Sequence, residues 1–526
     1  GNALTAAGPA RRNRCACPHC RTVNRYPDAG NGPPKHALFA IEYHCPSCKP
    51  HHRGRFFKLP DSSDVDLISQ AEAAWNSLEP VFVPDDKIPE GDETNRLHRW
   101  GYRHYREMFN TRQLLGLELS CRFIMDQPEE RMRNALATNL SDLLRYQNML
   151  CRYDSMALKS LDIFSVHGFP VGLIQCESNF LGIRGRNDAE NVGSGGWSNI
   201  TAKFIKAKSY CDRPFEVLHR GTRKIIVDMP GEWIGETDGR PTPHRRRQVE
   251  LSSADAALAI LEPESLDAVL TDPPYFGNVQ YAELMDFCYV WLRRLIGKPI
   301  AAFTPKTTRN PGELTGNENM GRGLEHFTEG LSSAFRKMAF ALKRGAPLAF
   351  TYHHNVIDAY WPVAVAILDS GLTCSASFPC PAEMGASIHI NGTKSSILDT
   401  VFVCRSTGQV PAKWIAGSPD GVAGLVREDV EKLKQADLTA TVGDIRCITF
   451  GHLVRLAVWS LRRSWDPHLS TDRRLGIVAR WINSFGNMAS IETCLHDVLS
   501  VSPPLQRTAA WEAQTPYGDI HAQVSF

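Results

Sequence analysis

The residues best suited to chemistry form the run Asp272-Pro273-Pro274-Tyr275, directly after the apolar segment 266–270. An apolar segment with one outward acid predicts a short buried strand, and two prolines end it because proline cannot donate to a sheet ladder. The strand therefore leads into a stiff loop that begins with an acid and ends with an aromatic ring. Asp272 and the Pro273 carbonyl can both accept hydrogen bonds from an amino group, and Tyr275 offers a face on which a flat base can stack.

This loop is suited to methyl transfer onto the exocyclic amine of a base. The nitrogen lone pair of such an amine is delocalised into the ring, so the amine is a poor nucleophile. Two acceptors that favour a more tetrahedral nitrogen release the lone pair toward a methyl donor. The alternative is an ordinary strand that ends at a Pro-Pro turn, but the continuation Phe276-Gly277-Asn278-Val279-Gln280-Tyr281 favours the functional interpretation.

The stretch 270–294 closely resembles the adenine-specific DNA methylases that carry an inserted zinc ribbon, a family often found in prokaryotic anti-phage gene clusters. In that family, as here, Asp-Pro-Pro-Tyr is followed by an Asn-Val pair, a Tyr-Ala pair and a helix of the pattern Phe-x-Tyr-Val-Trp-Leu. The resemblance covers most of the chain, including a ribbon near its start. It implies an S-adenosylmethionine-dependent DNA methyltransferase that modifies adenine N6, in phage defence or restriction–modification.

The site residues that follow from the motif and the resemblance fall into three groups. The catalytic residues are those of the Pro-Pro loop, and the next polar and aromatic residues line the base pocket. Asp255 lies just past an expected strand, where methyltransferases of this type bind the adenine of the cofactor, although a helix N-cap by the same residue is the competing interpretation. The assignments are Asp272, Pro273, Pro274 and Tyr275 for catalysis, Asn278 and Tyr281 for the base, and Asp255 and Thr271 for S-adenosylmethionine.

Two CxxC pairs near the start predict a metal site. Cys17-Pro-His-Cys20 and Cys45-Pro-Ser-Cys48 can place four thiolates tetrahedrally around zinc, with a strand expected at 39–43. Four protein ligands leave no open position, so the zinc is expected to be structural. A module this small cannot bury enough core without metal. Nearby residues that leave the ligand count open are Cys15, His44 and His51.

Composition sets the broad class of the protein. A chain of 526 residues predicts roughly two to four domains, and its net charge of +2 means that a nucleic acid would meet local basic patches. No apolar run reaches membrane-spanning length, and the start is not a signal peptide. Fifteen cysteines with two CxxC pairs favour metal sites in a reducing cytoplasm over a disulfide scaffold, so we expect a cytoplasmic protein.

The hydrophobic pattern predicts an α/β protein. Strand–helix alternation followed by a terminal pair of strands is typical of the second half of a class-I, Rossmann-like methyltransferase sheet. We divide the chain into a zinc ribbon with a basic tail, a helical region, an irregular Gly-rich connection, the methyltransferase catalytic half and a helical extension, at 1–60, 61–165, 166–248, 249–405 and 406–526. Strands are expected at 225–228, 249–251, 266–270, 346–352, 372–378 and 398–404, and helices at 129–151, 281–295, 326–342, 357–368, 424–436 and 446–464, with another helix that Thr111 caps.

The cofactor-binding half of the expected sheet is not found. Such a sheet needs a first strand that ends in a Gly-rich turn of Asp-x-Phe-x-Gly-x-Gly type and a second strand that ends in an acid. The glycines at 193–196 lack this lead-in; they allow a backbone approach to cofactor or DNA, or a flexible loop. In the resembling family these elements precede the zinc ribbon. We therefore expect a second polypeptide, or an N-terminal segment, to supply them, with DNA as the other partner.

Three alternatives remain open. The same motif serves methylation of the cytosine N4 amine, and related loops act on RNA bases. The third alternative is a non-catalytic DNA-recognition or scaffold subunit that keeps the fold but does not bind cofactor. The intact Asp-Pro-Pro-Tyr argues against this subunit role, and the absent Gly-rich turn argues for it.

Overall fold

The computed structural model describes most of the chain between residues 10 and 495. All structural statements below refer to these residues. They are 10–11, 14–16, 20–25, 30, 32–45, 55–154, 158–172, 174–183, 194–220, 223–229, 250–297, 300–317, 320–382, 396–407, 410–436, 438–485 and 488–495.

The chain folds into two compact units. The first comprises residues 1–252 and 281–309, and the second comprises residues 253–280 and 310–526. The chain therefore passes from the second unit to the first directly after the Asp-Pro-Pro-Tyr segment and returns at residue 310. Each unit is described by itself.

The first unit begins with small antiparallel sheets. Strands β1 (Ala10–Arg11), β2 (Arg14–Ala16) and β3 (Val23–Arg25) form one sheet, and β4 (Ile41–His44) pairs with β5 (Arg55–Lys58). The strand expected at 39–43 thus lies about two residues further along. Later hairpins are β6 (Tyr153–Asp154) with β7 (Lys159–Ser160) and β8 (Phe215–Arg220) with β9 (Arg223–Asp228).

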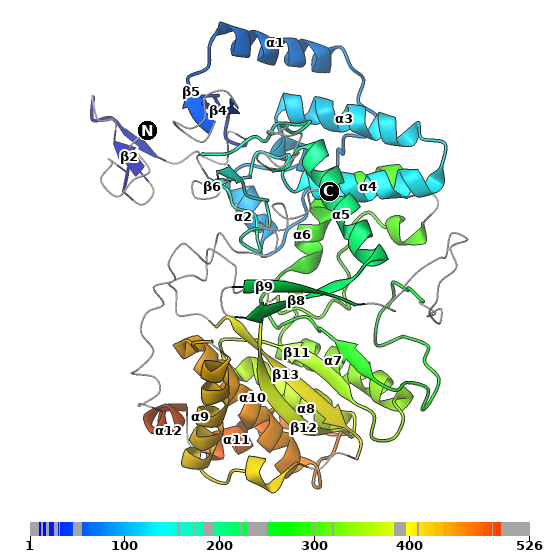
Figure 1. Cartoon of the computed structure of the whole chain (residues 1–526), viewed down its shortest axis with the longest axis vertical. Coiled ribbons are helices and arrows are strands. Elements are labelled where there is room, and N and C mark those ends of the chain that lie inside the picture. Colours follow the sequence, from blue (N-terminus) through cyan, green and yellow to red (C-terminus); the bar gives the residue numbers. More distant parts are fainter. Residues whose placement is uncertain are drawn as a thin grey trace. The chain divides into compact units, whose positions relative to one another are not determined.

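Helices form the rest of the first unit (Figure 1). They are α1 (Ser62–Asn76), α2 (Thr94–Arg99), α3 (Thr111–Met125), α4 (Glu130–Leu144), α5 (Trp197–Asp212) and α6 (Tyr281–Ile296), with a short 3-10 helix at Tyr105–Met108. The predicted cap of α3 is wrong by one residue. Asn110, not Thr111, accepts from the Gln113 amide at 2.9 Å, and the Gln113 side chain accepts from the Asn110 amide at 3.1 Å. This reciprocal pair is a capping box, and Thr111 is the first helical residue.

Aromatic rings form the centre of the first unit. Phe109 stacks on Phe287 with ring centroids 5.6 Å apart and meets Trp291 edge-on at 5.4 Å. Phe287 and Trp291 belong to α6 and to the Phe-x-Tyr-Val-Trp-Leu pattern, and both are fully buried. That pattern therefore serves packing, because large rings supply most of the apolar area that a core of this size can bury.

A mixed four-stranded sheet organises the second unit. Its order is β10-β11-β13-β12, in which β10 and β11 are parallel and β13 is antiparallel to both of its neighbours. The strands are β10 (Val269–Thr271), β11 (Leu348–Tyr352), β12 (Thr373–Pro381) and β13 (Leu398–Arg405). The helices are α7 (Leu324–Ala341), α8 (Trp361–Asp369), α9 (Pro419–Gln435), α10 (Val442–Leu461), α11 (Thr471–Ser484) and α12 (Met488–Cys494), with a 3-10 turn at Ile357–Tyr360 before α8. The α/β class is confirmed.

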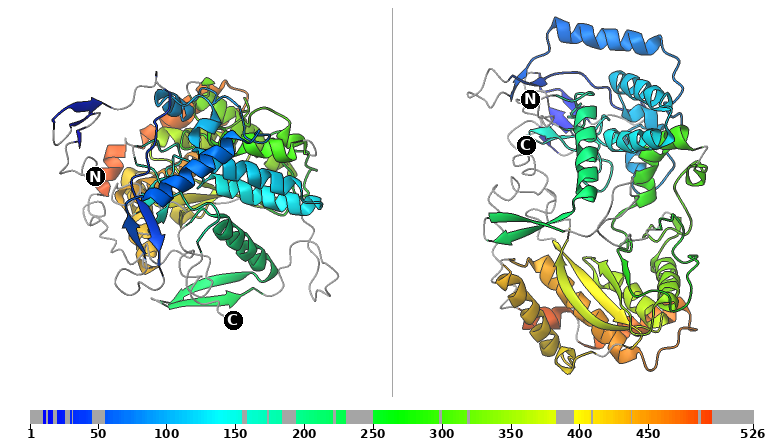
Figure 2. Two further views of the ribbon diagram at one scale, coloured as in Figure 1. Left: turned by 90° about the horizontal axis from the view of Figure 1, so that it is seen from above. Right: turned by 45° about the vertical axis from the view of Figure 1, so that its right-hand side comes forward.

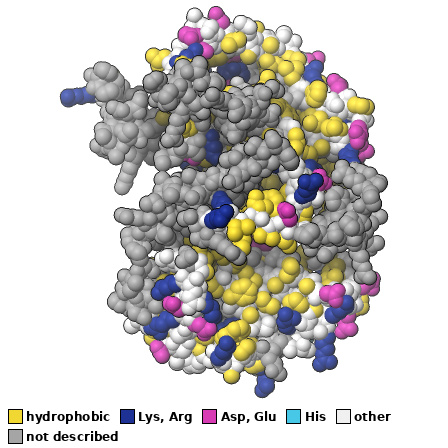
Figure 3. Space-filling view, viewed as in Figure 1, with side chains coloured by type: hydrophobic (Ala, Val, Ile, Leu, Met, Phe, Trp, Pro, Cys, Tyr) yellow, Lys and Arg dark blue, Asp and Glu magenta, His cyan; other side chains and the backbone are white. Residues whose placement is uncertain are grey.

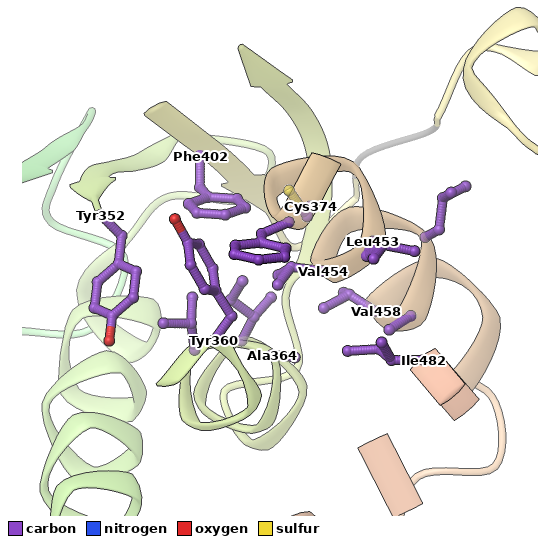
Figure 4. Close-up of a cluster of buried hydrophobic side chains, with 14 of the residues drawn as sticks. Tyr352, Tyr360, Ala364, Cys374, Phe402, Leu453, Val454, Val458 and Ile482 are labelled. Atoms are coloured by element: carbon purple, nitrogen blue, oxygen red, sulfur yellow. The ribbon is translucent and has the colours of Figure 1, made fainter. Parts of the chain in front are cut away.

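Helices cover one face of this sheet (Figures 1 and 2). Burial alternates along β11 and β13, as expected for strands with one packed face. Phe350 stacks on Phe402 at 5.2 Å and contacts Phe335 of α7 at 4.9 Å. Figure 4 shows Tyr352 and Phe402 of the sheet and Tyr360 of the 3-10 turn in one cluster, with Leu453, Val454 and Val458 of α10 beside them.

Two predicted strands need correction. Leu270 is 79% exposed, so the expected buried strand is neither buried nor paired beyond β11 within the described part of the chain. Glu250 and Leu251 form no strand, and Val249 lies outside the described residues. Within the described residues, β10 has no partner beyond β11, and residues 250–251 have no partner strand. Figure 3 shows hydrophobic side chains gathered over β11 and β13.

Candidate active site

The Asp-Pro-Pro-Tyr loop lies at the carboxyl edge of the parallel strand pair. In the register of β10 and β11, Thr271 is opposite Phe350, so Asp272 follows beside Thr351. The loop then turns through Gly277, whose φ of +67° favours glycine, and the Asn278 amide donates to the Tyr275 carbonyl at 3.3 Å. The carboxyl ends of parallel strands are where α/β sheets gather functional groups.

Asp272 is exposed, but one of its oxygens is fixed. Its Oδ1 accepts from the Thr351 hydroxyl in a short hydrogen bond and from the Tyr275 hydroxyl at 3.2 Å. No described residue donates to Oδ2. The two bonds orient the carboxylate from the sheet side and leave Oδ2 as an acceptor for an incoming amine.

The sequence predicts a Tyr275 ring that is free to stack on a base, but in the structure the ring is partly packed. It is half-buried, with its ring 5.3 Å from that of Tyr352, and its hydroxyl lies 3.2 Å from Asp399 Oδ2 as well as from Asp272. Burial raises the pKa of Tyr275, and the negative charges of Asp399 and Asp272 raise the pKa further. The hydroxyl therefore keeps its proton and bridges two carboxylates. Stacking of a base on the ring remains a prediction.

The remaining motif residues are distributed over both units. Pro273 is buried and Pro274 is half-buried, so the loop is anchored on the sheet. Asn278 is exposed, and its side-chain amide donates to the His353 carbonyl at 3.4 Å. Tyr281 is 44% exposed and begins α6 in the first unit, whereas Asn278 belongs to the second.

Sequence reasoning missed three residues that hold this loop. Gln280 is buried, donates to the Gly316 carbonyl at 2.6 Å and accepts from the Asn317 side chain at 3.0 Å. Thr351 and Asp399 fix the hydrogen bonds of Asp272 and Tyr275. A polar residue near the end of β11 is a signal that the sequence offers for Thr351. Gln280 and Asp399 give no local signal, because their contacts depend on the fold.

Two histidines follow β11 behind the loop. The ring of His353 lies 6.5 Å from that of Tyr275, and its Nδ1 lies 3.6 Å from the Cys447 thiol. Burial lowers the pKa of His353, and the neighbouring His354 lowers it further. Burial likewise lowers the pKa of His354. Both rings are therefore neutral near pH 7 and pack behind the Asp-Pro-Pro-Tyr loop.

Both predicted cofactor residues, Asp255 and Thr271, lie in the second unit. Asp255 is exposed, and its Oδ1 accepts from the Ala257 amide at 2.8 Å, so it caps a turn, not the helix of the competing interpretation. Thr271 is half-buried at the end of β10. Gly195 has a φ of +84°, and an added Cβ would meet Tyr146, which explains a glycine there by packing. The cofactor roles of Asp255 and Thr271 remain predictions.

The zinc prediction falls mainly outside the described residues. Cys17 and Cys48 lie outside them, whereas Cys20 is exposed before β3 and Cys45 follows β4. Within the described residues no group of three or more metal-ligating side chains is present. Cys20 and Cys45 are therefore the two predicted ligands that the structure places, each next to a small antiparallel sheet.

Comparison with known proteins adds no relative. No family model matches the chain, and no curated protein or solved structure is significantly similar to it. Among the described helices, none combines the length and apolar character needed to cross a membrane.

We predict that acid destabilises the protein in part through His353. The folded-state pKa of His353 lies below its ordinary value of 6.5, so the unfolded chain binds the proton first as the pH falls. The stability contribution of neutral His353 is present above that value and decreases below it. Between about pH 7.5 and about pH 5.5, the melting temperature of His353→Gln should fall less than that of the wild type, while exposed His468→Gln follows the wild type. An equal fall in His353→Gln would contradict the assignment.

Proposed function

We propose that this chain is the catalytic half of an S-adenosylmethionine-dependent DNA methyltransferase that modifies the exocyclic amine of a flipped base, adenine N6 first. One observation carries the proposal. Asp272 stands at the carboxyl edge of a parallel strand pair, with Oδ1 fixed by Thr351 and Tyr275 and with Oδ2 open. A role in phage defence or restriction–modification follows from the family resemblance of the motif.

The residues of the loop would bind and polarise the amine. Asp272 Oδ2 accepts one amine hydrogen and the Pro273 carbonyl the other, which draws the nitrogen toward a tetrahedral geometry. Pro274 stiffens the loop, and the accessible part of Tyr275 contacts the base. Asn278 and Tyr281 lie along the same stretch as candidates for the base pocket. S-adenosylmethionine, when bound, supplies an electrophilic methyl group.

The described residues supply only part of a cofactor site. Asp255 and Thr271 offer polar groups, but Asp255 already caps a turn and the described residues contain no Gly-rich turn after a strand. We propose that a second polypeptide or a further segment of the protein carries this turn. The strand order β10-β11-β13-β12 supports the proposal, because it fits the second half of a class-I methyltransferase sheet. The open β10 edge is where the other half would pair.

We also propose a structural zinc bound by Cys17, Cys20, Cys45 and Cys48. The support is the CxxC spacing, together with the position of Cys20 and Cys45 beside short antiparallel strands. Sheets of two or three short strands bury little core, so a metal would stabilise them.

A non-catalytic scaffold role is the second candidate. The bond from the Tyr275 hydroxyl to Asp399 favours it, because this bond holds the ring against the sheet rather than toward a base.

Methylation of cytosine N4 or of an RNA base would use the same acceptors, so the substrate base must be found by assay.

The first test removes the acceptor. Asp272→Ala should lower methyl transfer to duplex DNA by about 100-fold or more, the usual effect of losing one polar group that stabilises a transition state. The assay uses the protein purified from its native cells with its bound partners. Asp267→Ala is the matched control, because Asp267 is an exposed acid on the same segment that pairs with Lys343. Undiminished methylation by Asp272→Ala would refute the catalytic assignment.

The second test asks whether another polypeptide supplies the cofactor-binding half of the sheet. The chain expressed alone should bind S-adenosylmethionine weakly or not at all in a calorimetric titration and should not methylate DNA. Leu270→Asp should release a co-purifying partner without unfolding the chain, because this side chain is exposed. A control with Val65→Asp, on exposed α1, should retain the partner. A monomer that methylates DNA unaided would show that its cofactor turn lies elsewhere in this chain.

The third test counts metal. Elemental analysis should find one zinc per chain, and Cys20→Ser should lose it. Cys211→Ser is the control, because Cys211 is an exposed cysteine on α5 outside the CxxC pairs. Zinc-free wild-type protein would rule the site out, and zinc retained by Cys20→Ser would assign a ligand to Cys15, His44 or His51.

A further inference from the structure

A cavity lies in the first unit, on a segment to which no role has been assigned. Its volume is about 1000 Å³, and it lies against α2 and the chain on either side of that helix. Lys87 and His104 face each other in an isolated antiparallel bridge on one wall. The polar residues of the lining that could act as donors are Lys87, Asn95, His98, Arg99, Arg103 and His104.

The frame of this cavity is held by side chains bonded to backbone carbonyls. Arg103 Nη1 donates to the carbonyls of His98 and Tyr102, each at 2.9 Å, and His98 Nε2 lies 3.0 Å from the Ile88 carbonyl. On the other rim, Arg309 donates to the carbonyls of Pro89 and Glu90. The wall is therefore preorganised, which lowers the entropic cost of binding a ligand.

The cavity wall carries unbalanced positive charge. Lys87, Arg99 and Arg103 are exposed, and Glu90 is the one acid of the lining. Neither Lys87 nor Arg99 has a hydrogen-bond or ion-pair partner in the described part of the chain. A basic residue at the end of α2 is favourable in itself, but this effect accounts for Arg99 alone and not for Lys87 or Arg103 on the flanking segments.

The nearby acids do not neutralise this charge, because they bind elsewhere. Asp85 pairs with Arg106 at 2.8 Å, and Asp86 pairs with Arg294 at 2.8 Å. Glu107 accepts from the His104 amide at 2.9 Å in the cap of a 3-10 helix and lies 3.6 Å from His104 Nδ1, so it is not paired with Lys87 or Arg99. The cations of the cavity thus remain available to a ligand from solution.

We propose that this cavity binds the phosphodiester backbone of a nucleic acid. The inference rests on the proposed function and deepens it, because it names where the DNA backbone is held. Guanidinium groups bind phosphate in a fixed, bidentate geometry, and Lys87 adds a point charge. The lining has no Phe, Tyr or Trp ring, the larger rings on which a base could stack, which favours backbone contact over nucleotide binding. The contact is independent of sequence and fixes the register of the protein on its substrate.

The experiment measures binding of a labelled DNA duplex by fluorescence anisotropy over a range of salt concentrations. The double variant Lys87→Ala/Arg99→Ala should bind several-fold more weakly, and the negative slope of log K against log salt should become less steep by roughly 1.8 for two lost phosphate contacts. Arg131→Ala/Lys208→Ala removes two cations outside the cavity and should keep the wild-type slope. Lys87→Arg/Arg99→Lys keeps both charges and should keep the slope as well. Thermal unfolding checks that each variant is folded.

The outcomes separate this inference from the proposed function. Unchanged affinity and slope in Lys87→Ala/Arg99→Ala, an equal loss in the control pair, or no DNA binding by the wild type would each overturn the cavity assignment. Polyglutamate that binds the cavity more tightly than DNA would assign it to an acidic peptide instead. Methyl transfer is not measured, so these outcomes do not depend on whether the catalytic proposal holds.

Discussion

Two buried carboxylates of α6, Glu283 and Asp286, hold other segments of the first unit against this helix. Glu283 is 2% exposed, and its carboxylate accepts from the amides of Asp92, Glu93 and Thr94 at 2.9–3.1 Å. One turn further on, Asp286 accepts from Thr308 and pairs with Arg309 at 3.2 Å. A buried carboxylate is tolerated only when such donors satisfy it, so these bonds must form together. An added Cβ at Gly91 would meet Glu283, which leaves little room for another arrangement.

The same helix links the two stretches to which we assign function. Arg293 and Arg294 of α6 pair with Asp86, just before Lys87, and Arg309 holds the rim of the basic cavity. At its other end, α6 begins one residue after Gln280, which anchors the Asp-Pro-Pro-Tyr loop in the second unit. A single continuous stretch therefore supplies the loop and then the support of the cavity.

The sequence predicted most regular elements and the pairing of the last two strands, but not the exposure of β10. Helix α7 and strand β13 lie within two residues of their expected bounds, because periodicity reports directly which face is buried. Exposure of Leu270 could not be predicted, since an apolar run looks the same whether or not a neighbouring strand covers it. In the candidate site, Asp272 and Tyr275 were identified from their types and spacing. Asp399, which reaches Tyr275 across 124 positions, belongs to the site through the strand order alone.

The Tyr275 hydroxyl can donate its proton to either of two carboxylates. It has one proton to donate and lies 3.2 Å from both Asp272 Oδ1 and Asp399 Oδ2, so at any moment one carboxylate faces a lone pair instead of a donor. Under the proposed function, an amine on Asp272 Oδ2 would add a donor to that carboxylate, and the hydroxyl could then donate to Asp399. The proton stays on Tyr275 in both cases, because burial and the two acids raise its pKa.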